Sequence, residues 1–147
     1  MPTLHIIQSL DDPRLALLAD DPVRPEIPAE FRVSDSSAVY VLLDDSGSAS
    51  AVVCAAFRCM IPSTVMELVL PPESAPSVAV FYTIWSYVPG AGRRLIAAAR
   101  SSIQAEYPEV VKFVTLSPPT DMARVFHLRN GAEVFRVNPD TVNYLYP

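Results

Sequence analysis

The fold is decided by residues 78–103, which read VAVFYTIWSYVPGAGRRLIAAARSSI. The first eight are mostly apolar strand formers without strict alternation, a pattern typical of a central strand buried on both faces. A short turn follows over Val88–Gly92. Behind it, apolar residues from Leu95 to Ile103 recur at helical spacing, and arginines cover the other side. The stretch therefore predicts a buried strand, a glycine turn and a helix.

This turn and the first turn of the helix predict an anion site. The free N–H groups of a first helical turn point outward, and glycines let the backbone approach a phosphate closely. Two arginines at this position oppose the helix dipole, and a bound phosphate would supply the reason for them. A plain helix-packing turn with solvated arginines would have the same sequence. The candidate phosphate-binding residues are Val88, Gly90, Ala91, Gly92, Arg93 and Arg94.

Length and composition indicate one domain over residues 1–147, large enough to bury a core. Half of the residues are hydrophobic and 18% are charged, which excludes disorder. No apolar run approaches the roughly 18 residues of a membrane helix, and the N-terminus does not read as a signal peptide. Cys54 and Cys59 lack the partners that a metal cage requires, so we expect free thiols in a reducing cytoplasm and no metal.

The net charge of −5 is unevenly distributed. Residues 1–76 carry 4 basic and 11 acidic groups, whereas residues 77–147 carry 7 and 5, so the first part is at −7 and the second at +2. An acidic protein is a poor candidate for nucleic-acid binding. Because the basic surplus lies in the half with the glycine turn, the charge favours a small polyanionic ligand.

The rest of the chain predicts a mixed α/β, or α+β, fold with a central mixed sheet of six to seven strands flanked by helices. The strand at 78–85 and the next strand, at 110–117, are joined by a helix, so they should run parallel, and we expect them to splay apart at their C-terminal ends. A second helix should start at Thr120 and bury Met122, Val125 and Phe126. The other expected strands are at 4–7, 38–43, 51–57, 132–137 and 141–146, and a helix should follow Asp11-Asp12-Pro13. The segment at 61–68 is ambiguous between helix and strand, with Ser63 as the candidate cap of a helix. A proline-rich loop is expected at 21–28 near the site, and the acids at 20–21 and 44–45 are expected to lie in turns.

Two segments together resemble the acyl-CoA-binding core of the GNAT acyltransferase superfamily. Residues 90–96 read G-x-G-x-x-L-hydrophobic, and residues 123–132 read A-x-x-hydrophobic-aromatic-x-x-x-G-small. The resemblance implies that the first turn holds the pyrophosphate of CoA. It also implies that His127, where that family usually has tyrosine, protonates the departing thiolate. Tyr87 stands where the family usually has arginine or glutamine.

A narrower resemblance is to the catalytic domain of malonyl-CoA decarboxylases. It covers roughly residues 50–146 and rests on four segments in the same order: FYTI at 81–84, FVTLSP at 113–118, FHLRNGA at 126–132 and VNYLY at 142–146. In those enzymes a histidine of the FHL segment acts with a serine on the thioester. The corresponding hydroxyl here would come from Thr83 or Ser86. The chain carries no counterpart of that family's helical N-terminal domain or of its long insertions.

The resemblance implies a site in which His127, Thr83 and Ser86 are catalytic. Backbone N–H groups near Ile84 to Ser86, with Trp85 between them, would stabilise the oxyanion. Histidine suits either chemistry because it ordinarily titrates near neutrality. The two tyrosines at 144 and 146 are expected to be core or edge-strand aromatics rather than catalytic acids.

Three functions follow as expectations. The first is a GNAT-type acyltransferase that passes acetyl from acetyl-CoA, or another acyl-CoA, to an amine of a small molecule or protein. The second is a minimal malonyl-CoA decarboxylase-like enzyme, and the third is a CoA-binding module that acts by binding a protein partner. In each case we expect an acyl-CoA partner, no nucleic acid, no membrane and a cytoplasmic location, and a homodimer is a candidate assembly.

Overall fold

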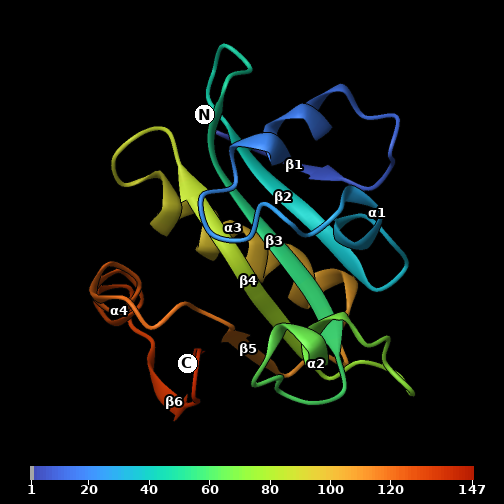
Figure 1. The fold of residues 1–147 in the computed structure, drawn as a ribbon. Helices are drawn as coiled ribbons and strands as arrows, with labels where there is room; N and C mark the ends of the chain where they lie inside the picture. Colours follow the sequence, from blue (N-terminus) through green and yellow to red (C-terminus); the bar gives the residue numbers. More distant parts are fainter. Residues whose placement is uncertain (1) are drawn as a thin grey trace.

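The computed structural model describes residues 2–147 and places seven strands in one mixed sheet (Figure 1), in the order β1-β2-β3-β4-β5-β7-β6. All neighbouring strands pair antiparallel except β4 and β5, which run parallel. The strands are β1 (Thr3–Ile7), β2 (Ser37–Leu43), β3 (Ala49–Arg58), β4 (Val78–Ser86), β5 (Lys112–Thr115), β6 (Glu133–Val137) and β7 (Val142–Tyr146). The helices are the 3₁₀ helix η1 (Pro13–Asp20), α1 (Ala29–Arg32), α2 (Val65–Val69), α3 (Ala91–Glu106) and α4 (Asp121–Arg129).

Each face of the sheet is covered by its own layer. Helix α3 buries Leu95, Ile96, Ala99 and Ile103 against one face, as its helical spacing predicted. The connection between β1 and β2, together with α2, covers the other face (Figure 1). Strands β2, β3 and β4 are therefore buried on both sides, which explains why their sequences are apolar without alternation.

The parallel pair β4–β5 separates part of the way along β4. Pairing runs from Val78–Lys112 to Phe81–Thr115, and one more bond, from the Leu116 N–H to the Phe81 carbonyl, closes it. Residues 82–86 of β4 continue without a partner on that side. The predicted splay of the two parallel strands is therefore confirmed, and we call the opening the fork.

The register of β4 against β3 shifts at the start of the fork. Phe81 pairs with Ala55 and Thr83 pairs with Cys54, so Tyr82 is the extra residue of a β-bulge. The bulge lets both Tyr82 and Trp85 pack on the face covered by the β1–β2 connection. It also bends the strand at the point where it leaves β5.

Three expectations from the sequence are corrected. In α4, Met122 and Val125 are exposed to solvent, 85% and 48% respectively, so the expected buried stripe is wrong; the helix instead buries His127. Asp21 is a buried ion-pair partner and not a turn acid in solvent. The ambiguous segment forms helix α2, whose N-cap is Thr64 rather than Ser63.

Within residues 2–147, no helix is long and apolar enough to cross a membrane.

Candidate active site

A cleft of about 580 Å³ lies at the fork. Strand β4, the segment after β5, helix α4 and the start of the 21–28 loop form its walls, and most of the lining surface is apolar. No aspartate or glutamate is among the lining residues that the structure describes. These residues are Pro22, Val23, Phe81, Tyr82, Thr83, Ile84, Trp85, Ser86, Gly92, Ser117, Pro118, Thr120, Met122, Ala123, Phe126 and His127.

The open edge of β4 offers backbone hydrogen-bonding groups to this cleft. The Tyr87 N–H donates to the Ser50 carbonyl at 2.8 Å, which fixes the phase of the ladder between β4 and β3. Because backbone groups alternate sides along a strand, Thr83 and Trp85 also face β3, whereas Ile84 and Ser86 direct their N–H and C=O groups toward the fork. An extended ligand with amide groups can pair with this edge.

His127 is a buried titratable side chain that lines the cleft. Its Nδ1 lies 2.7 Å from the Tyr146 Oη, and its ring stacks on Tyr144 with 5.1 Å between ring centroids. Burial lowers the pKa of His127 to about 4, so the ring is neutral near pH 7. This corrects the expectation of a histidine that titrates near neutrality. Burial also raises the pKa of the Tyr146 phenol, which keeps its proton.

The tautomer of His127 follows from this pair. The Tyr146 hydroxyl has the imidazole as its hydrogen-bond partner, and a buried O–H without an acceptor would cost free energy. The phenol therefore donates to Nδ1, and the proton of the neutral ring sits on Nε2. When Nε2 releases that proton, Nδ1 can take the proton of the phenol. His127 and Tyr146 together form a two-step proton path.

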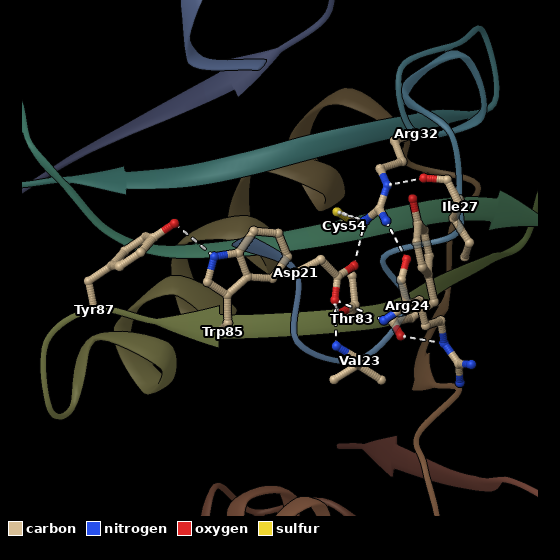
Figure 2. Close-up of polar contacts among 10 residues, drawn as sticks. Asp21, Val23, Arg24, Ile27, Arg32, Cys54, Thr83, Trp85 and Tyr87 are labelled. Atoms are coloured by element: carbon tan, nitrogen blue, oxygen red, sulfur yellow. Dashed lines mark hydrogen bonds and ion pairs between the residues drawn. The ribbon is translucent and has the colours of Figure 1, made fainter. Parts of the chain in front are cut away.

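Thr83, the other candidate catalytic group, belongs to a buried polar network (Figure 2). Its hydroxyl donates to the Asp21 Oδ1 at 2.9 Å, and the backbone N–H groups of Val23 and Arg24 donate to the same oxygen. Arg32 donates to the second oxygen at 2.7 Å. Burial opposes ionisation of Asp21, but these hydrogen bonds hold its pKa below the usual value, so it is a carboxylate. Thr83 is thereby fixed in one orientation.

The remaining predicted residues of β4 lie at the outer end of the cleft. Trp85 donates through Nε1 to the Tyr87 Oη at 3.0 Å, and Tyr87 in turn donates to Asp20 at 2.7 Å (Figure 2 shows the first of these bonds). Ser86 is exposed beside them, and its side chain is nearer to solvent than that of Thr83. Of the two candidate hydroxyls, that of Thr83 is therefore buried and that of Ser86 exposed.

The predicted phosphate turn lies at the start of α3, next to the cleft. Gly90 is exposed at φ +80°, a left-handed conformation that favours glycine. Arg93 and Arg94 are exposed on the first helical turn. Of the first-turn N–H groups, that of Ala91 is occupied, because it donates to the Val88 carbonyl at 3.2 Å.

Gly92 has a packing role that sequence reasoning missed. A Cβ on Gly92 would lie 3.0 Å from the Phe126 ring, so glycine here allows α3 and α4 to approach closely. A substitution at Gly92 would move the Phe126 ring, and with it the wall of the cleft. A branched residue at 92 is therefore expected to disturb the packing of α3 against α4.

Sequence reasoning also missed the buried partners of Thr83 and His127. Asp21 looked like a turn acid, and Tyr146 looked like a core aromatic 19 residues from His127. The only signals were the proline-rich loop, expected near the site, and the VNYLY segment that contains Tyr146.

Among residues 2–147, no group of three or more His, Cys, Asp or Glu side chains could hold a metal ion.

No family model and no curated protein sequence matches the chain. Solved structures do match. Malonyl-CoA decarboxylase from Agrobacterium vitis has a TM-score of 0.80 at 18% identity, over 99% of this chain and 60% of that one. An IAA acetyltransferase from Bacillus cereus has a TM-score of 0.63 at 13% identity, over 99% of each chain. The catalytic domain of a Tetrahymena histone acetyltransferase, solved with coenzyme A, has a TM-score of 0.58 at 16% identity, over 99% of this chain and 93% of that one.

These likenesses show a GNAT fold, as the sequence predicted. More particularly, the fold is shared with malonyl-CoA decarboxylases and with acetyltransferases, the two groups that the sequence segments resembled. The chain spans about 60% of the length of the decarboxylases it matches.

Proposed function

We propose that the protein binds an acyl-CoA with its thioester in the cleft at the fork, and that it decarboxylates a malonyl-type acyl group. The observation that carries this proposal is the cleft itself, which is mostly apolar, contains no carboxylate among its lining residues and holds a buried, neutral His127. The match to malonyl-CoA decarboxylases over 99% of this chain supports it.

An apolar cleft suits decarboxylation for an electrostatic reason. A free carboxylate loses its hydration on entering such a cleft, whereas the transition state spreads the charge toward the thioester oxygen. The bond between the carboxyl carbon and Cα breaks, its electron pair forms the enolate, and carbon dioxide leaves. One of the unpaired N–H groups, that of Ile84 or that of Ser86, can donate to the enolate oxygen.

The enolate then needs one proton at Cα to become acetyl-CoA. His127 gives the Nε2 proton, and the Tyr146 phenol passes its proton to Nδ1, so the imidazole stays neutral throughout. Solvent later returns the proton to the tyrosinate. No imidazolium forms, which fits a histidine whose pKa is lowered to about 4 by burial. The negative charge of the enolate passes to the Tyr146 oxygen, where it is short-lived because burial raises the pKa of that phenol.

Acyl transfer to an amine is the second candidate, and a specific observation favours it. The chain matches acetyltransferases along 93–99% of their length, whereas it spans about 60% of the decarboxylases. Transfer requires a base for the ammonium form of the acceptor, and the lining residues offer only the imidazole of His127 and a few hydroxyls. The acceptor would be an amine of a small molecule or protein. The cytoplasmic location and the homodimer stay predictions.

The test is to incubate the pure protein with malonyl-CoA and, separately, with acetyl-CoA, and to follow carbon dioxide and free thiol. Carbon dioxide from malonyl-CoA without any amine, lost in His127→Ala, is the expected result. Thiol release that appears only when amines are added would support transfer instead. If neither product forms but CoA binds in calorimetry, the protein is a binding module and the proposed reaction is wrong.

The phosphate turn has its own test. Replacing Arg93 and Arg94 by glutamine should weaken CoA binding while the affinity for pantetheine, which lacks the nucleotide phosphates, stays the same. Equal loss for both ligands, or no loss for either, would remove the phosphate role from this turn.

A further inference from the structure

The proline-rich loop at 21–28 crosses the fork on the face opposite to α3, and buried arginines hold it there. The Arg24 guanidinium donates through Nε to the Tyr82 carbonyl at 3.1 Å and through Nη2 to the Leu116 carbonyl at 2.9 Å. Tyr82 belongs to β4 and Leu116 follows β5, so one side chain bridges the two strands just where their own pairing stops. The loop is thus fastened to both sides of the fork.

Arg32 fixes the loop from within. It is 1% exposed and donates to the Ile27 carbonyl at 2.9 Å, to the Arg24 carbonyl at 2.5 Å and to Asp21 at 2.7 Å. Asp21 in turn accepts from the backbone of Val23 and from Thr83 (Figure 2). Every one of these bonds lies in a buried or partly buried place, where water does not compete well for it. The loop is therefore rigid at the fork.

Pro22 and Val23 are the two residues of this loop that line the cleft. Val23 lies between Asp21, which accepts its N–H at 2.8 Å, and Arg24, which is tied to the fork. Its side chain is branched at Cβ, and its neighbours on the loop cannot shift without breaking the buried bonds. It lines the cleft as a fixed apolar wall.

We propose that Val23, held by Arg24 and Asp21, restricts the acyl group of the bound acyl-CoA to short chains. The proposal rests on the thioester lying in the cleft, as in the proposed function. A rigid apolar wall discriminates against each extra methylene by about 10–200-fold. The proposed reaction uses no atom of the Val23 side chain, so we expect truncation of that side chain to act on the chain-length preference.

The test measures binding, so that it does not depend on the reaction. Calorimetry with acetyl-CoA, butyryl-CoA and hexanoyl-CoA should show at least a 10-fold loss of affinity from acetyl to butyryl in the wild type. Val23→Ala should reduce that loss at least threefold. Arg24→Met, which releases the loop from the fork, should act in the same direction. Val111→Ala, an exposed valine outside the cleft lining, is the matched control and should behave like the wild type.

The outcomes separate this inference from the proposed function. Chain-length discrimination in binding that Val23→Ala relaxes, without carbon dioxide from malonyl-CoA, would support the wall and refute decarboxylation. Equal turnover of malonyl-CoA and ethylmalonyl-CoA in the wild type would support decarboxylation and refute the wall. Equal affinity for all three acyl-CoAs, an unchanged ratio in a folded Val23→Ala variant, or no acyl-CoA binding at all would also refute the wall.

Discussion

Acid should unfold this protein at a higher pH than protonation of its carboxylates alone would require, because His127 is buried in its neutral form. Burial lowers its pKa from 6.5 to about 4 in the folded state, while the unfolded chain keeps the ordinary value. The unfolded state therefore binds more protons between these two values. Stability from this residue is complete above about pH 6.5 and is lost as the pH falls toward about 4.

The magnitude follows from the two pKa values. At pH 5 the unfolded imidazole is almost fully protonated and the folded one is mostly neutral, which removes about 2 kcal/mol of unfolding free energy relative to pH 7. The full loss, reached below pH 4, is about 3 kcal/mol. For a domain of this size, whose stability is typically about 5–15 kcal/mol, that is a large share.

Urea unfolding at pH 7 and pH 5 measures the effect, with His127→Gln as the matched variant. Glutamine does not titrate and can still accept a hydrogen bond from Tyr146, so the difference between the two proteins isolates the imidazole. We expect the wild type to lose about 2 kcal/mol more than the variant between these pH values. Equal losses in both proteins, or a His127 ring signal in NMR that titrates near pH 6.5, would refute the buried neutral imidazole.

Three further predictions concern single side chains. Arg32→Met should lower the free energy of unfolding by about 3–5 kcal/mol in urea, because Asp21 would stay buried without its ion-pair partner; a loss below 1 kcal/mol would contradict that. Gly92→Ala should cost about 1–3 kcal/mol through the contact with the Phe126 ring, and the cost should shrink in a Phe126→Leu background, as a double-mutant cycle would measure. Tyr146→Phe should lower turnover about 10²–10⁴-fold with unchanged CoA affinity, because the phenol supplies the second proton of the path; wild-type turnover would exclude the relay.

Local patterns in the sequence were enough to predict most of the fold. The apolar run of β4, the glycine turn and the spacing of α3 are properties of one continuous stretch, and the structure has all three in place. The hairpin β2–β3 and the Thr120 cap of α4 are likewise local. The parallel pairing of β4 and β5 followed from the helix between them, because a crossover of that length requires it.

The site was only partly predictable because its partners meet through tertiary structure. His127 was found from its segment, but the hydroxyl beside it is on β7, and no local pattern joins the two. Asp21 reads as a turn acid in any window of the sequence; only the fold shows that Arg32 and Thr83 surround it. The prediction for the apolar residues of α4 was wrong for the opposite reason, because here a local pattern exists but misleads. The spacing of these residues predicts burial, yet the helix leaves Met122 in solvent.

The fork divides the backbone amides of one strand into two populations. The N–H groups of Thr83 and Trp85 are locked into the ladder with β3, whereas those of Ile84 and Ser86, each one residue further along, face the cleft without a strand to accept them. In deuterated water the first pair should exchange only when the sheet opens, and the second pair should exchange far faster. A ligand that completes the missing edge would erase this alternation, so the exchange rates of two amides would report directly on the occupancy of the cleft.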